Sequence, residues 1–111
     1  MHEFAPLLSL IVPTRGRPEQ LRTMLASVAA TARNPERVEI ILVIDSDDLF
    51  EPPATFPTLN IKRIIGAPGR TMGQLNRDGY EASRGQYVML LNDDVIVRTR
   101  GWDRTVLSCF R

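Results

Sequence analysis

The chain has 111 residues, of which 43% are hydrophobic and 24% charged, close to the average of globular proteins. This length fits one ordinary domain, and the composition excludes a disordered or fibrous protein. Fourteen basic residues nearly balance thirteen acidic ones, for a net charge of +1. That balance argues against binding to nucleic acid or to an anionic membrane surface, because proteins that do so present patches of one sign.

Cysteine, histidine and apolar runs limit the function further. The longest uninterrupted apolar run, residues 40–44, is far shorter than the roughly 20 residues that span a bilayer, so no membrane span is expected. The first residues show no signal-peptide pattern. Cys109 and His2 are the only residues of their types, which excludes an internal disulfide and a cysteine-based zinc site. We expect a cytoplasmic protein in which oxygen atoms bind any metal.

The first half of the chain predicts two strands and a helix between them. Residues 7–12 form an apolar run that ends at Pro13, as in a buried strand. Pro18 suits the first turn of a helix, and Asn34-Pro35 ends it. The apolar residues between them recur at helical spacing: Leu21, Met24, Leu25, Val28, Ala29 and Ala32. Residues 38–44 are almost all apolar or β-branched, which predicts a central strand covered on both faces.

The second half predicts two more strands and two more helices. Residues 49–60 contain three prolines and are expected to be a loop, and 61–65 form a third strand. Thr71, with Gln74 three residues later, is typical of a capping box and begins a helix that runs to about residue 84, where Gly85 stops it. A fourth strand follows at 87–91, then a short extended piece at 95–97 and a helix from residue 101 to 110.

The order of these elements predicts an α/β fold, a mostly parallel sheet with helices on both faces. Ligands of such sheets bind beyond the carboxyl ends of the strands. Four loops follow those ends, at residues 13–16, 45–48, 66–70 and 92–94. An acidic loop after a strand, taken alone, is more often a turn without a bound ligand, because Asp and Asn are frequent turn residues. Together the loops bring carboxylates, arginines and glycines to one edge, a combination that suits a phosphate ligand with a divalent metal.

Four segments in this order resemble the nucleotide-binding half of family 2 glycosyltransferases, which have the GT-A fold, over about residues 7–105. Residues 10–21 are similar to the first strand, Pro-Thr loop and first helix of that family. Residues 43–48 resemble its acidic turn after the second strand, and 90–94 lie where it has an Asp-x-Asp motif. The remaining matches lead into that motif: Asn76, Gly79, Gly85, Tyr87 and Val88.

The resemblance implies a Rossmann-like domain, residues 1–111, that binds a nucleotide-diphospho-sugar with Mn²⁺ or Mg²⁺ for sugar transfer to an unknown acceptor. In this interpretation Asp45 contacts the base and Arg70 approaches the diphosphate. The first loop and the second helix complete the nucleotide site through Pro13, Thr14, Arg15 and Asn76. The metal site comprises Asn92, Asp93 and Asp94.

Two departures from the family pattern affect this site. Asn92 stands at the first Asp of the Asp-x-Asp motif, although its carbonyl oxygen still suits a metal or a ribose hydroxyl. Asn76 lies one residue further from Gly85 than is usual in the family.

The length of the chain also departs from the family, whose members are usually at least twice as long. Their second half carries the acceptor contacts and the catalytic base. We therefore expect a domain truncated relative to them, with its catalytic residues unknown. Asp103 is the only acidic residue after Asp94, and we expect it to be a solvated residue at a helix start.

Two other functions stay open from the sequence. The first is a non-catalytic truncated nucleotide-binding or oligomerisation module, whose exposed apolar surface would form a homo-oligomer such as a dimer. The second is a nucleotidyltransferase. It ranks lower because no long glycine-rich loop with a lysine follows the first strand.

Overall fold

The computed structural model describes residues 6–48, 56 and 58–110. The predicted order of strands and helices is confirmed, with ends that differ by one or two residues. The second helix ends at Ala82 rather than near residue 84, and the third strand begins at Asn60. The elements are β1 (Leu8–Thr14), α1 (Pro18–Thr31), the 3₁₀ turn η1 (Pro35–Arg37), β2 (Val38–Asp45), β3 (Asn60–Gly66), α2 (Met72–Ala82), β4 (Tyr87–Leu90) and α3 (Trp102–Ser108).

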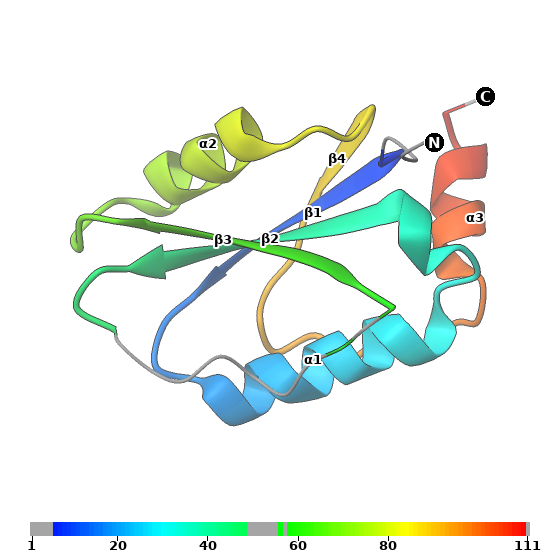
Figure 1. The fold of residues 1–111 in the computed structure, drawn as a ribbon, viewed down its shortest axis with the longest axis horizontal. Helices are drawn as coiled ribbons and strands as arrows, with labels where there is room; N and C mark the ends of the chain where they lie inside the picture. The colour runs from blue at the N-terminus through cyan, green and yellow to red at the C-terminus, as the bar shows by residue number, and fades with distance from the viewer. Residues whose placement is uncertain (1–5, 49–55, 57, 111) are drawn as a thin grey trace.

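The four strands form one sheet in the order β3-β2-β1-β4, and every pairing is parallel. Figure 1 shows α1 and α2 on opposite faces of this sheet, with α3 near the end at which the strands begin. The predicted fold class, a parallel sheet with helices on both faces, is therefore confirmed. Most of the predicted loop at 49–60 lies outside the described residues.

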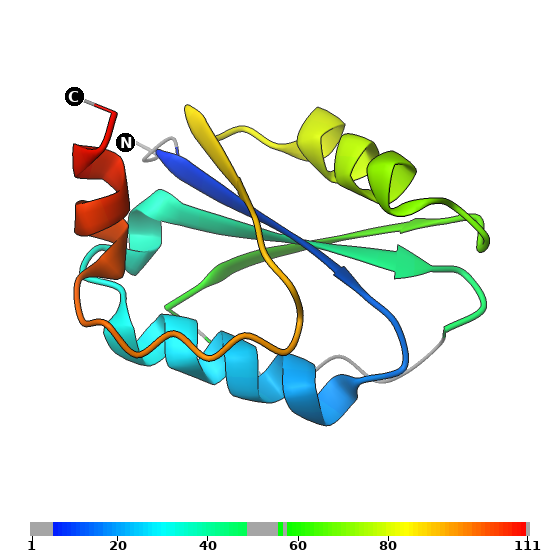
Figure 2. The ribbon, with the colours of Figure 1, turned by 180° about the vertical axis from the view of Figure 1, so that it is seen from behind.

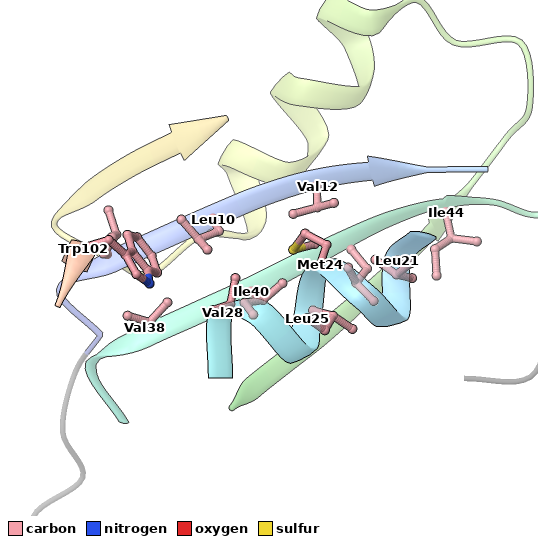
Figure 3. Close-up of a cluster of buried hydrophobic side chains, with 12 residues drawn as sticks. Leu10, Val12, Leu21, Met24, Leu25, Val28, Val38, Ile40, Ile44 and Trp102 are labelled. Atoms are coloured by element: carbon pink, nitrogen blue, oxygen red, sulfur yellow. The ribbon is translucent and has the colours of Figure 1, made fainter. Parts of the chain in front are cut away.

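The main core lies between the sheet and α1. Alternate residues of β1 face this side, and the four buried residues of α1 pack against them (Figure 3). All eight residues of β2 are buried, as expected of a central strand. The α1 side of the core includes Leu10, Val12, Leu21, Met24, Leu25, Val28, Ile40 and Leu42. In the described chain, no helix combines the length and apolar character needed to cross a membrane.

The opposite face is thinner, and α2 lies close against it. Its buried residues are Ile11, Ile41 and Val43. A Cβ atom at Gly79 of α2 would collide with Cγ2 of Ile11 and lie 3.2 Å from Cγ2 of Val43. Gly79 therefore sets how closely α2 approaches the sheet.

After β4 the chain runs back alongside α1 (Figure 2). The backbone N–H of Val97 donates to Oγ of Ser27 at 2.9 Å, and that of Gly101 donates to the carbonyl of Thr31 at 2.7 Å. Residues 95–97, predicted as a short extended piece, make no strand pairing with the described strands. Val97 is instead hydrogen-bonded to α1, and the N–H of Val95 donates to the carbonyl of Asn92 at 3.4 Å.

Asp103 corrects a prediction. It is 2% exposed rather than solvated, and its two carboxylate oxygens accept hydrogen bonds from the backbone N–H groups of Arg33 and Asn34, at 2.8 and 2.9 Å. Burial is tolerated because both oxygens are paired. These partners follow α1, which has 14 residues and hence a length of about 20 Å. Asp103 thus attaches the start of α3 to the residues that follow α1. This contact lies at the opposite end of the sheet from the carboxyl ends of the strands.

Replacing Gly79 with Ala should destabilise the chain by about 1–3 kcal/mol, because the added methyl group overpacks the face of Ile11 and Val43. Gly73→Ala is the matched control in the same helix, where the nearest atom to a new Cβ is 3.9 Å away. That variant should be neutral or up to about 1 kcal/mol more stable, from helix propensity. Urea unfolding of both variants measures the difference. Equal stabilities would contradict this account of α2.

Candidate functional site

A cavity of about 660 Å³ opens at the carboxyl edge of the sheet, where the four predicted loops meet. Eight of the nine predicted site residues line it, and Asn76 is the ninth. The eight are Pro13, Thr14, Arg15, Asp45, Arg70, Asn92, Asp93 and Asp94. Parallel pairing brings them together, since each follows or ends a strand. Two further charged residues, Arg17 and Asp47, also line the cavity.

Asp45, the last residue of β2, lies between two arginines. One carboxylate oxygen accepts a hydrogen bond from Arg15 at 2.9 Å, and the other accepts one from Arg70 at 3.2 Å. The side chain of Asp45 is 12% exposed. Its negative charge is therefore compensated within the protein, as burial of a carboxylate requires.

Arg70 is held from several sides. It donates hydrogen bonds to Asp78 at 2.6 Å and to the carbonyls of Ala67 and Ile44 at 2.8 and 3.2 Å, besides the bond to Asp45. The bond to Asp78 raises the pKa of Arg70 above its ordinary value; burial opposes this, and Asp45 adds to it. Because these bonds engage all three guanidinium nitrogens, Arg70 is the rigid partner of Asp45.

Arg15 is the more exposed partner, with 56% of its side chain accessible. Two of its nitrogens donate to the two oxygens of Asp47, at 2.5 and 3.2 Å. This paired contact raises the pKa of Arg15, with a smaller contribution from Asp45, and lowers that of Asp47. Arg15 thereby connects the loop after β1 to the acidic turn after β2.

The loop after β4 carries the other acidic cluster. Asp93 is almost buried, and its carboxylate accepts a hydrogen bond from the Thr14 hydroxyl at 2.9 Å. Asp94 has 55% of its side chain exposed. The guanidinium of Arg17 lies 3.6 Å from Asp93 and 3.8 Å from Asp94. The loop thus presents one anchored and one accessible carboxylate, with an arginine facing both.

The sequence of residues 9–107 matches the family model described as glycosyl transferase family 2. The chain belongs to this family. No curated protein matches the sequence.

Solved structures of TarS from S. aureus share the fold of this family 2 domain. Residues 1–349 of TarS superpose with a TM-score of 0.72 at 17% identity, covering 94% of this chain and 32% of the TarS chain. The same TarS segment in complex with UDP gives a TM-score of 0.68 at 16% identity, covering 91% and 31%. The fold is therefore α/β of the GT-A type. This chain spans about a third of the length of the solved chains it matches.

The acidic loop of this family 2 domain has the chemistry of a partial site for Mg²⁺ or Mn²⁺. Asn92, Asp93 and Asp94 offer hard oxygen ligands at the cavity. Among the described residues, no group of three His, Cys, Asp or Glu side chains could hold a metal ion. Mg²⁺ is usually bound by one or two carboxylates together with substrate phosphates and water. The residues therefore fit an ion whose remaining ligands come from a bound diphosphate.

Asn76 lies in an adjoining hollow of about 340 Å³ rather than in the main cavity. Pro13, Met72 and Asn92 line both spaces. The role expected of Asn76 in nucleotide binding stays a prediction, since Asn76 lines the neighbouring space and not the main cavity.

Three charged residues of the site were missed from the sequence. Arg17 and Asp47 stand within the segments that resemble the family, next to residues that were chosen, so neighbourhood alone could have suggested them. Asp78 carried no such signal. It lies eight residues after Arg70, in α2, and only the packing of α2 brings its carboxylate to the guanidinium.

The pairing of Arg15 with Asp47 predicts a pH effect. A lowered pKa of Asp47 stabilises the folded chain above the unfolded value of about 4, and this contribution is lost as the pH falls through the lowered pKa. Arg15→Gln should raise the pKa of Asp47 toward the ordinary value of an aspartate. Carboxyl-carbon NMR titration of both chains measures the shift. An unchanged pKa in the variant would show that Arg15 does not control it.

Proposed function

We propose that this family 2 domain binds a nucleotide-diphospho-sugar donor together with Mn²⁺ or Mg²⁺, for transfer of the sugar to an acceptor. One observation carries the proposal. A single cavity places the Arg15–Asp45–Arg70 cluster on one side and the acidic loop at Asn92–Asp94 on another. The first suits a nucleobase and the second a metal-bound diphosphate. The TarS segment, which shares this fold, forms a complex with UDP.

The surroundings of Asp45 favour uracil or thymine as the base. Both present an acceptor, an N–H donor and a second acceptor along one edge. Asp45 supplies an acceptor with an arginine donor at each of its oxygens, 2.9 and 3.2 Å away. Arg15 donates through three of its five N–H groups and keeps donors for a base oxygen, whereas Arg70 already donates to four acceptors. Cytosine and adenine lack the central donor, and pairing Asp45 with either would set acceptor against acceptor.

The phosphates belong near the acidic loop. Asp94 is accessible, and Asp93 is held in place by Thr14. A divalent ion on these carboxylates would supply the positive charge that stabilises a leaving nucleoside diphosphate. The expected contact of Arg70 with the diphosphate stays a prediction. Its hydrogen bonds to Asp78, Ala67 and Ile44 support the role of holding Asp45 instead.

The acceptor and the catalytic base stay unassigned in this proposal. Asp103, the one acidic residue after Asp94, is paired to backbone N–H groups beyond the far end of α1. It cannot reach an acceptor in the cavity. This proposal therefore assigns no catalytic base to the described residues.

Calorimetric titration with UDP in the presence of Mn²⁺ tests the donor site. Asp45→Asn should weaken UDP binding by about 1–3 kcal/mol, because a charged acceptor of the base is lost. Glu81→Gln is the control, an exposed carboxylate of α2 that pairs with Arg77 and does not line the cavity. UDP should also bind more tightly than CDP. Absence of binding at millimolar UDP, or equal affinity of the Asp45→Asn variant and the unaltered chain, would reject the assignment.

The surface near β4 favours a second property, self-association of the chain. This strand is an edge of the sheet, and Met72, Leu90 and Ile96 are exposed apolar residues. Leu90 and Met72 both line the hollow beside the cavity. Exposed strand edges and apolar patches promote association, so we propose that the isolated chain forms a homo-oligomer through this side.

Light scattering at micromolar concentration should therefore show a dimer or larger species, and Leu90→Asp should shift it to the monomer. Tyr80→Ser removes an equally exposed residue from α2 and serves as the control. A monomeric unaltered chain would refute the self-association.

A further inference from the structure

We propose that Arg17 acts as an internal cation that competes with the divalent metal for Asp93 and Asp94 until the donor diphosphate arrives. The inference rests on the proposed function and adds to it a residue that couples metal binding to nucleotide binding. Arg17 precedes α1 and lies against the loop after β4, so it joins two of the four loops of the cavity.

The geometry of Arg17 differs from that of the other two arginines in the cavity. Arg15 and Arg70 donate hydrogen bonds of 2.5–3.2 Å to carboxylates. The guanidinium of Arg17 lies 3.6 and 3.8 Å from Asp93 and Asp94, beyond hydrogen-bond distance. It is therefore attracted to both carboxylates but is not locked onto either.

The backbone of Arg17 is fixed while its side chain is accessible. Its carbonyl accepts the first helical hydrogen bond of α1, from Leu21 at 2.9 Å. The side chain is 55% exposed. The guanidinium can move within the cavity without disturbing the helix.

A divalent ion on Asp93 and Asp94 would be repelled by a guanidinium that faces the same two carboxylates. Metal binding therefore has to move Arg17. The guanidinium of Arg17 is 55% exposed and makes no hydrogen bond to either carboxylate, so its displacement costs little free energy. A diphosphate offers the displaced guanidinium new oxygen partners of high affinity, and it also supplies the missing ligands of the metal.

The consequence is positive coupling between the two ligands. Without nucleotide, Arg17 lowers the affinity for the metal. With nucleotide, the phosphates draw Arg17 away, and the metal binds more tightly. By thermodynamic reciprocity the metal strengthens nucleotide binding by the same factor. Among the described residues, three basic ones line the cavity, and of these Arg17 is the one paired with the acidic loop.

Mn²⁺ binding to the chain, followed by electron paramagnetic resonance of the free ion, tests this directly and needs no enzymatic activity. Without nucleotide, Arg17→Gln should bind Mn²⁺ about three- to tenfold more tightly than the unaltered chain, the effect expected of removing two long ion pairs of an exposed guanidinium. Arg17→Lys keeps the charge and should bind Mn²⁺ as the unaltered chain does. The increase of Mn²⁺ affinity caused by UDP should be smaller in Arg17→Gln.

Arg22→Gln is the matched control, an exposed arginine one turn further along α1 that pairs with Glu19 and does not line the cavity. It should leave Mn²⁺ binding unchanged. Asp94→Ala in the Arg17→Gln background should remove the gain, which shows that the ion binds at the acidic loop.

Equal or weaker Mn²⁺ binding by Arg17→Gln would overturn the inference. Failure of the unaltered chain to bind UDP would instead reject the donor site itself. The two failures are distinguishable because Mn²⁺ is titrated alone as well as with UDP. If the Arg17→Gln variant does not fold, an NMR measurement on the unaltered chain still tests the inference. The Nε–Hε NMR resonance of Arg17 should shift on addition of Mg²⁺ and UDP together, and a stationary resonance would refute the displacement.

Discussion

Parallel pairing of β1 with β2 and β4 is the constraint on which the cavity depends. Parallel strands end at one edge, so the chain after each strand starts from neighbouring positions. The register pairs Thr14 with Ile44 and Asp45 with Gly66, which sets three of the loops side by side. The fourth begins just after Leu90, the partner of Ile11. Residues up to 79 positions apart in sequence thereby come into hydrogen-bond contact, as Thr14 and Asp93 do.

Burial of the sheet makes this edge rigid enough to hold charges. β2 is covered on both faces, by α1 and by α2, and the close approach of α2 at Gly79 brings Asp78, the residue before it, within reach of Arg70. Arg70 in turn holds Asp45. The charged cluster at the base of the cavity is thus a consequence of helix packing, and its orientation depends on apolar contacts with Ile11 and Val43.

The cavity is organised into two parts by how its charges are satisfied. Around Asp45 the carboxylates and guanidiniums are joined by short hydrogen bonds. At the acidic loop the ion pairs of Arg17 are longer, at 3.6 and 3.8 Å, and are not hydrogen bonds. Such pairs contribute little to stability, whereas a bound cation or phosphate interacts strongly with the same groups. The first part is therefore suited to recognition in a fixed geometry, and the second to exchange of one charge partner for another.

The sequence by itself determined the order of the elements and the parallel α/β class, and of the nine site residues that it predicted eight line the cavity. It could do so because apolar periodicity reports burial locally and because strand ends in such folds share one edge. Only the tertiary structure decided which groups each charged side chain pairs with. From the sequence, Asp103 is expected to be a solvated residue at the start of a helix. The return of the chain along α1 instead buries it against Arg33 and Asn34. In the sequence Asp78 is one more polar residue of α2, and Asn76 lines a neighbouring hollow instead of the cavity. The direction in which a helix presents such residues depends on its rotation and distance from the sheet, which side chains of distant segments set and no local pattern encodes.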